Sequence, residues 1–129
     1  MPSSREWSIT PSLVRNICSA ARSTYPNEFI SMLGVKEKGS HTLSELVILP
    51  SEFGRTHSTI RADLIPFDPL IVGSIHSHPD EGAYPSSADR NFFSRMGHVH
   101  IIAGYPYSFE TMRAYDSKGK RITLAVSET

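Results

Sequence analysis

The sequence predicts a mixed α/β fold, in which two helices flank a largely antiparallel or mixed β-sheet. Two stretches carry apolar residues near the 3.6-residue period of a helix, and seven others have the length and pattern of strands. Turn-forming residues separate these stretches, and no repeat or low-complexity tract interrupts them. The length of 129 residues fits a single domain spanning residues 1–129.

The first half of the chain predicts one helix and then strands. Thr10-Pro11 is typical of a helix start, apolar residues recur at helical spacing after it, and Pro26 marks the exit. Residues 28–37 and 42–50 have strand character on either side of a Lys-Gly-Ser turn, which favours a hairpin. Alternation over residues 57–65 predicts a third strand.

The second half predicts a buried strand, a short helix and three closing strands. Residues 70–78 begin with a continuous apolar run, which is typical of a strand buried on both faces. Residues 79–85 are expected to form a loop, and residues 86–96 a helix with a serine cap and an apolar face. Residues 98–105, 111–117 and 121–127 are the last three strands, and a Lys-Gly-Lys turn joins the final two.

Composition excludes several classes of protein. With 13 basic and 13 acidic residues the formal net charge is zero, which argues against a nucleic-acid partner. No apolar run approaches the length of a membrane span, and the first ten residues lack a signal-peptide pattern. The single cysteine, Cys18, excludes an intrachain disulfide and is expected to be a buried structural thiol. A cytoplasmic location with no membrane partner is therefore the expectation.

One stretch, GSIHSHPDEGAYPSSADRNFF, carries the pattern of a metal site. His76 and His78 end a predicted strand, so their side chains project from the same face. Pro79 stops that strand, and after a seven-residue loop Ser86 and Asp89 open the next helix. This topology can fold Asp89 back beside the histidines. Two imidazoles and one carboxylate leave a fourth tetrahedral position for water, which is the arrangement of catalytic zinc.

Simpler interpretations of these residues remain open at this point. Ser86 and Asp89 also have the spacing of a helix-capping pair, and Asp89 could both cap and ligate. A second His-x-His pattern, His98 and His100, has no acid at ligand spacing and is expected to be packed or hydrogen-bonded within a strand. The remaining polar candidates are expected to be solvated or structural: His41, His57, Ser77, Asp80, Glu81 and the Tyr105–Tyr107 turn.

The stretch HSHPDEGAYPSSAD resembles the signature of the JAMM (MPN-plus) metalloproteases, H-[ST]-H-P followed by S-x-x-D, with an upstream glutamate. The segments YPNEFISMLG, ELVILP and HIIAGYPY are similar to family segments on either side, so the resemblance covers nearly the whole chain. It implies an MPN/JAMM-like fold of the cytidine-deaminase-like type, similar to compact single-domain archaeal members.

The resemblance also implies roles for five residues. His76, His78 and Asp89 would ligate one Zn²⁺ per chain. Glu28 would hold the attacking water and act as general base, and Ser86 would hydrogen-bond the developing oxyanion. Reasoning from the residues alone does not select Glu28 over Glu45 or Glu52.

The activity implied is that of an isopeptidase, which cuts the amide between the C-terminal Gly-Gly of a ubiquitin-like modifier and a lysine. In the family the modifier tail adds to a strand edge, for which residues 53–66 are the first candidate. The run from Asp89 to His100 is too short for the second of two family insertions, which favours a smaller archaeal modifier. A peptidase that trims sulfur-carrier C-termini and a non-catalytic scaffold are the alternatives.

Overall fold

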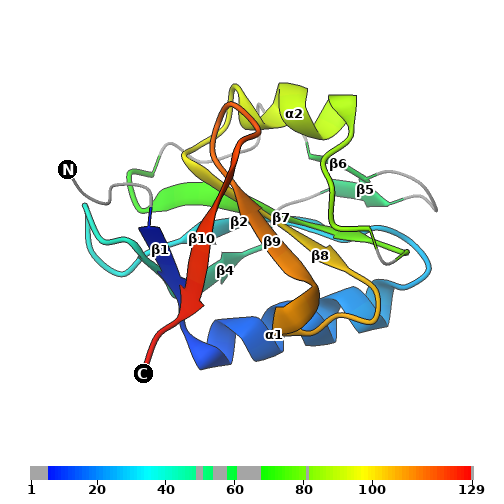
Figure 1. Ribbon diagram of the computed structural model, residues 1–129, viewed down its shortest axis with the longest axis horizontal. Coiled ribbons are helices and arrows are strands. Elements are labelled where there is room, and N and C mark those ends of the chain that lie inside the picture. Colours follow the sequence, from blue (N-terminus) through cyan, green and yellow to red (C-terminus); the bar gives the residue numbers. More distant parts are fainter. Residues whose placement is uncertain (1–5, 49–50, 54–57, 61–67, 81, 129) are drawn as a thin grey trace.

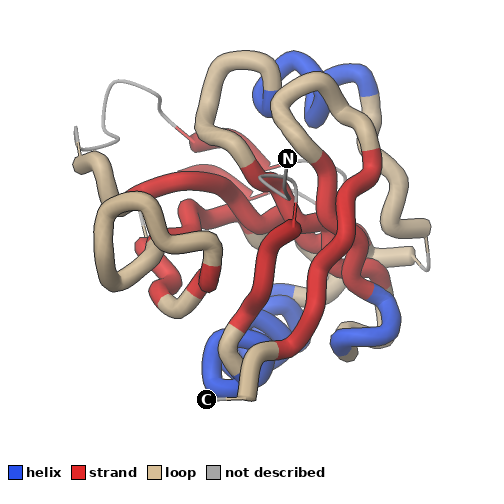
Figure 2. Tube along the Cα trace, turned by 60° about the vertical axis from the view of Figure 1, so that its left-hand side comes forward, coloured by secondary structure: helices blue, strands red, loops and turns tan. Residues whose placement is uncertain are grey.

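The computed structural model describes residues 6–48, 51–53, 58–60, 68–80 and 82–128. Within them a mixed sheet lies between two helices, with α1 (Pro11–Thr24) on one face and α2 (Ser87–Phe93) on the other (Figures 1 and 2). The order across the sheet is β3 (Thr42–Leu43), β1 (Glu6–Ile9), β10 (Arg121–Val126), β9 (Met112–Tyr115), β8 (Val99–Gly104), β7 (Ile71–His78), β2 (Ile30–Gly34) and β4 (Glu45–Val47). The predicted fold class is confirmed.

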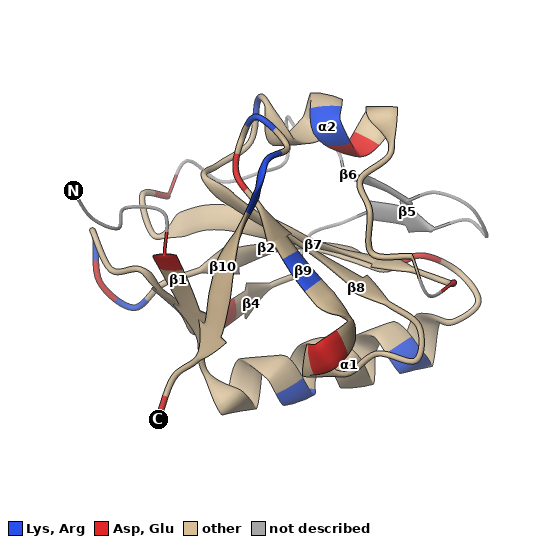
Figure 3. Cartoon of the chain, viewed as in Figure 1, with Lys and Arg blue, Asp and Glu red and all other residues tan. Residues whose placement is uncertain are grey.

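The central strands fix the position of the motif. β7 runs parallel to β8 and antiparallel to β2, so its histidine-bearing end lies in the middle of the sheet. A second, two-stranded sheet consists of β5 (Ser51–Phe53) and β6 (Ser58–Ile60). Figure 3 shows cations and anions interspersed over the described elements, as expected for a chain of zero net charge. No described helix is long and apolar enough to cross a bilayer.

The helix α1 forms as its sequence predicts. The hydroxyl oxygen of Thr10 accepts a hydrogen bond from the Leu13 amide at 3.2 Å, and Pro11 occupies the first turn. Its buried residues, Leu13, Ile17, Cys18 and Ala21, face the sheet in the main apolar core. Burial raises the pKa of the Cys18 thiol, which confirms the expectation of a structural rather than a reactive cysteine.

One predicted strand is divided in the structure, one observed strand was not predicted, and one predicted strand is only partly described. The described part of the predicted strand at 42–50 forms two short strands, β3 and β4, because β3 pairs with β1 while β4 pairs with β2. The strand β1 was not predicted, since its alternation of buried Trp7 and Ile9 with Glu6 and Ser8 is too short to recognise. Of the predicted strand at 57–65, the structure describes Ser58–Ile60 as the strand β6, and the rest lies outside the described residues.

The two faces of β7 differ in chemistry. Ile75 joins the apolar core beneath α1, whereas His76 contacts the rings of Phe92 and Phe93 from α2. Gly73 leaves no room for a side chain beside β8, since a Cβ there would be 1.9 Å from the Val99 carbonyl oxygen. The strand β7 therefore presents Ile75 to the core beneath α1 and the motif histidines to α2.

Candidate functional site

The end of β7 and the start of α2 bring three predicted ligands together. The Nδ1 atom of His76 lies 3.5 Å from Oδ1 of Asp89, and Nε2 of His78 lies 3.2 Å from Oδ2. Both histidines project from the α2 face because they are two residues apart on one strand. Asp89 reaches them because α2 begins directly above the end of β7 (Figure 1).

Ser86 and Asp89 also form the predicted helix cap. The hydroxyl oxygen of Ser86 accepts from the Asp89 amide at 3.0 Å, and Oδ2 of Asp89 accepts from the Ser86 amide at 2.9 Å. The cap holds the carboxylate in one orientation while its oxygens face His76 and His78. Capping and a place in the candidate site thus coexist in Asp89.

The three donors suit a small tetrahedral ion, although they now bond to one another. Among the described residues, no group of three or more His, Cys, Asp or Glu side chains is spaced to hold a metal directly. The two nitrogen–oxygen separations of 3.5 and 3.2 Å are nevertheless close to the ligand–ligand spacing of a tetrahedral zinc site, about 3.3 Å for ligand distances near 2.0–2.1 Å. The donor types and these two separations therefore fit a zinc site.

The electrostatics of this cluster favour a carboxylate between two imidazoles. Burial raises the pKa of Asp89, but the hydrogen bond from His78 and the nearby His76 outweigh it and lower that pKa to about 2. Burial lowers the pKa of His76 to about 4, so this imidazole is neutral. For His78 burial acts in the same direction, but the contacts with Asp89 prevail and the pKa is raised.

Glu28 lies beside this cluster, just before β2. Its neighbour Phe29 is tied to the residue between the two histidines: the Phe29 amide donates to Oγ of Ser77 at 2.7 Å, and the Ser77 amide donates to the Phe29 carbonyl at 2.8 Å. Burial raises the pKa of Glu28 to about 7, while the charge of His78 lowers it. Ser77 points to the opposite face from the histidines, as expected, and anchors the segment that carries Glu28.

The structure also separates Glu28 from its rivals. Glu45 is exposed and pairs with Gly34, at the end of β2 opposite to Ile30, the register partner of His76. The backbone of Glu52 lies in β5, and its side chain is outside the described part of the chain. Sequence reasoning could not make this choice, because the pairing of β2 with β7 decides it.

Three hydrogen bonds donated by tyrosine residues fix the end of β7 and the loop that follows it. The hydroxyl of Tyr107 donates to the His78 carbonyl at 3.1 Å, and the hydroxyl of Tyr115 donates to the Ala83 carbonyl at 2.6 Å. The Tyr105 amide donates to the Asp80 carbonyl at 2.8 Å. The Tyr105–Tyr107 turn is therefore packed, as predicted, and it also fixes the motif loop.

Asp80 has a local role that the sequence did not reveal. Its Oδ1 accepts a hydrogen bond from the Gly82 amide at 3.0 Å, which closes the turn after Pro79. Its charge also contributes to the raised pKa of Glu28. Glu81 lies outside the described residues.

The second His-x-His pair behaves differently from the first. His98 is exposed, whereas His100 is fully buried with its Nδ1 2.6 Å from Oγ of Ser74. That same hydroxyl lies 3.1 Å from Nε2 of His76. The predicted hydrogen-bonded strand pair is confirmed for His100, but its link to the candidate site was missed. Spacing offered a signal, since Ser74 shares the strand face of His76 and His78.

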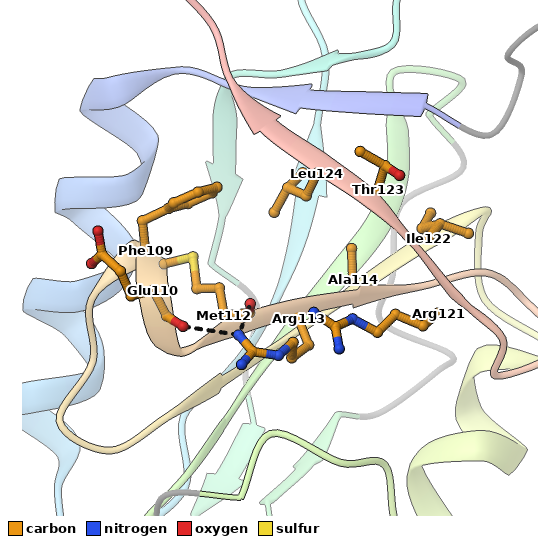
Figure 4. Close-up of a pocket in the computed structure, with 9 residues that line it drawn as sticks. All are labelled: Phe109, Glu110, Met112, Arg113, Ala114, Arg121, Ile122, Thr123 and Leu124. Carbon is orange, nitrogen blue, oxygen red and sulfur yellow. Dashed lines mark hydrogen bonds between the residues drawn. The ribbon is translucent and has the colours of Figure 1, made fainter.

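A hollow on the surface lies away from the motif. It opens between β9 and β10, where their pairing ends at Ile122 and Ala114. Figure 4 shows its lining, with Arg113 donating to the carbonyls of Glu110 and Met112. None of the five predicted site residues lines this hollow, so it is separate from the candidate site.

Comparison with known proteins places this geometry in context. The sequence model of the family of prokaryotic homologs of the JAB domain matches residues 10–118 of this chain. A probable metalloprotease of Haloferax volcanii is 37% identical over 109 residues, covering 78% of this chain and 67% of that protein.

Solved structures agree with this match. One described as JAMM, a metalloprotease-like zinc site in the proteasome and signalosome, has a TM-score of 0.74 and 31% identity over 95% of this chain and 98% of its own. A JAB1/MPN domain protein from Archaeoglobus fulgidus has a TM-score of 0.73 and 30% sequence identity, and the match covers 95% of this chain and 97% of that protein. A Desulfitobacterium hafniense protein, at 16% identity and 0.66 over 95% and 93%, shares the fold.

Proposed function

Because the chain belongs to the family of prokaryotic homologs of the JAB domain and has a JAMM-type, metalloprotease-like domain, we propose that it is a zinc-dependent isopeptidase. The bond it hydrolyses joins the C-terminal Gly-Gly of a ubiquitin-like modifier to a lysine. The observation that carries the proposal is the convergence of His76, His78 and Asp89, with Glu28 beside them. The modifier and its conjugates are the partners that this activity requires.

His76, His78 and Asp89 would hold one zinc ion. When bound, zinc acts as a Lewis acid and lowers the pKa of water from about 15.7 towards about 7. The chain supplies neutral nitrogen from His76, whose pKa burial already lowers, and an ionised carboxylate from Asp89. These are the protonation states that metal ligands need.

Glu28 moves the proton. It accepts a proton from the attacking water as the water oxygen bonds to the amide carbon, and it then donates that proton to the amide nitrogen as the carbon–nitrogen bond breaks. Burial raises the pKa of Glu28 to about 7, and a divalent cation nearby would lower it again, which keeps the carboxylate ready to accept. Such general acid–base catalysis contributes about 10²–10⁴ in rate.

Ser86 stabilises the negative charge that develops on the carbonyl oxygen. Its Oγ already accepts from the Asp89 amide, so its own hydroxyl proton is available for donation to that oxygen. The helix cap thereby fixes the hydroxyl position before substrate arrives. Preorganised donors of this kind are worth about 2.7–4 kcal/mol in the transition state.

The substrate proposal rests on the family and on the small size of the site's surroundings. The helix α2 is only seven residues long, and β8 follows within six residues. This leaves little chain to grip a large modifier and favours a compact archaeal one. The strand edge proposed for the modifier tail, residues 53–66, lies mostly outside the described residues and stays a prediction.

The test is cleavage of purified modifier–lysine conjugates, read by mass spectrometry with and without a chelator. Wild-type protein should release intact modifier, and chelator should abolish the release. Glu28→Ala should lower the rate by about 10²–10⁴ while zinc content and folding are retained. The matched control is Glu45→Ala, which removes an exposed carboxylate on β4. Glu45 pairs with Gly34, at the end of β2 far from Glu28, so this variant should cleave like wild type. A Glu28→Ala protein that cleaves as fast as wild type contradicts the mechanism.

A further inference from the structure

Three polar side chains form a buried hydrogen-bonded chain across the α2 face of the sheet. Nε2 of His76 lies 3.1 Å from Oγ of Ser74, and that oxygen lies 2.6 Å from Nδ1 of His100. Ser74 and His100 are fully buried, and His76 is 7% exposed. The chain is built into the sheet, because Ser74 and His100 are register partners on the parallel strands β7 and β8.

Nothing in the packing alone requires this chain. Nε2 of His100 is buried without a hydrogen-bond partner of good geometry among the described residues, although the backbone of Gly97 favours the protonated ring. Burying a polar group that lacks a partner destabilises a fold relative to an apolar side chain of the same shape. The polar chain is therefore better explained by what it does for His76.

The position of the ring proton on His76 sets the direction of the hydrogen bonds from His76 through Ser74 to His100. The His76 nitrogen that faces Asp89 is Nδ1, and it can donate a lone pair to a metal only when the ring proton resides on Nε2. The Nε2 proton then needs an acceptor, which is Oγ of Ser74. The Ser74 hydroxyl donates its own proton onward, and Nδ1 of His100 accepts it. Both hydrogen bonds of the chain are then satisfied, and the His100 ring proton lies on Nε2, near the backbone of Gly97.

We propose that Ser74 and His100 are positioning residues for the metal, which hold His76 in the Nε2–H tautomer and aim its Nδ1 at the ion. The inference rests on the proposed metal site and adds two residues outside its ligand set. Hydrogen-bond partners of metal-ligating histidines typically change metal affinity by about 10- to 100-fold when removed. They act through ring orientation and basicity rather than by touching substrate.

His100 also has a packing role, which the test has to separate. Its ring stacks on Phe93 with centroids 4.4 Å apart and an interplanar angle of 10°. Phe93 belongs to α2, the helix that carries Asp89. Loss of His100 could therefore weaken metal binding either through the hydrogen bond or through the seat of α2.

Two crossed substitutions make that separation. His100→Phe keeps an aromatic ring against Phe93 but removes the acceptor, whereas His100→Asn keeps a hydrogen-bonding atom near the Nδ1 position and removes the ring. At the other link, Ser74→Ala removes the hydroxyl and Ser74→Thr restores it. The control is Ser31→Ala, a fully buried serine on β2 whose hydroxyl donates to the Val47 carbonyl.

The measurements are zinc affinity by chelator competition and the ¹⁵N chemical shifts of the His76 ring, which report its tautomer. Ser74→Ala and His100→Phe should each weaken zinc binding by about 10- to 100-fold and reduce the Nε2–H tautomer. Ser74→Thr and His100→Asn should recover most of both, and Ser31→Ala should match wild type. His100→Asn should still lower thermal stability, because it loses the stack.

The outcomes distinguish this inference from the proposed function. If wild type binds zinc but Ser74→Ala and His100→Phe bind it equally well, the positioning role is overturned and the metal site stands. If affinity follows the ring, so that His100→Phe resembles wild type and His100→Asn does not, the role of His100 is packing only. If wild type binds no zinc and Asp89→Ala makes no difference, both the proposed function and this inference fall.

Discussion

The two His-x-His pairs of this protein are identical in pattern and opposite in use. In the first pair, His76 and His78 lie at the end of β7, and both face the Asp89 carboxylate. In the second pair, His98 precedes β8 and is exposed, whereas His100 is buried beneath α2. Spacing puts side chains on one face, but the place of the pair relative to the strand end decides what they meet.

The physical difference lies in the elements that follow each pair. A loop and a helix start come directly after the first pair, so a capping carboxylate returns to the strand end. The second pair lies at the start of its strand, and β8 continues past it through Ile102 and Ala103. No acidic residue follows this pair at ligand spacing. The first pair therefore forms a candidate metal site. His100 of the second pair lies at the end of the hydrogen-bonded chain that reaches His76 through Ser74.

The largest expected effect comes from removing the aromatic ring that contacts one histidine of each pair. Phe93 is fully buried, stacks on His100 and contacts the edge of His76. Phe93→Ala should lower the free energy of unfolding by about 3–5 kcal/mol, because it leaves a cavity under α2. Urea unfolding measures it, with the half-buried Phe92→Ala as the comparison. Equal decreases in the free energy of unfolding in the two variants would show that Phe93 contributes no more than Phe92 to the packing of α2 on the sheet.

The next effect compares the pairs directly. His78→Ala removes a proposed ligand and should reduce zinc affinity and conjugate cleavage by more than about 100-fold, since even outer partners of ligands are worth 10- to 100-fold. His98→Ala removes an exposed ring and should leave affinity and cleavage unchanged, with stability within about 0.5 kcal/mol of wild type. A matched loss in His98→Ala would remove the distinction between the pairs.

The buried member of the second pair predicts a pH dependence of stability. Burial lowers the pKa of His100 to about 3, with further lowering by His76 and His98, while the backbone of Gly97 and the charge of Asp116 act in the opposite direction. The unfolded ring has a pKa near 6.5, so between these values the unfolded chain binds a proton that the folded chain does not. Stability from this group is present above about pH 6.5 and falls as pH decreases, by at most about 1.4 kcal/mol per unit.

Chemical unfolding of the chelator-treated protein at pH 7, 6 and 5 measures this dependence. His100→Phe should show a shallower decrease than wild type, because it lacks this titrating group. His98→Ala serves as the control and should keep the wild-type slope. Parallel slopes in wild type and His100→Phe would contradict a buried, neutral His100.

The smallest effect concerns what fixes the end of β7. Tyr107→Phe removes the hydroxyl that donates to the His78 carbonyl and should cost about 0.5–1.5 kcal/mol of stability. Thermal or urea unfolding measures the loss, and zinc affinity should fall only slightly because Asp89 still orients His78. A change as large as that of His78→Ala would mean that the strand end has no other support.

Much of the fold follows from patterns that involve near neighbours. The cap of α1, the helix opened by Ser86 and Asp89, and the strands β2, β7, β8, β9 and β10 were predicted close to their observed positions. The strand β1 was missed because four residues carry too little alternation, and the break between β3 and β4 was missed because two different partners cause it. Residue spacing indicated a site of His76, His78 and Asp89, and the resemblance to a known family added Glu28 and the oxyanion role of Ser86.

What the sequence determined by itself is local chemistry: two histidines on one strand face, a carboxylate at a helix start and a serine that caps it. Only the tertiary structure decided that Glu28 rather than Glu45 lies at this site, because antiparallel pairing sets Ile30 opposite His76. It also decided that Ser74 and His100 lie under His76, because parallel pairing joins residues 26 positions apart. Periodicity acts over a few residues, whereas strand register depends on how the whole sheet closes.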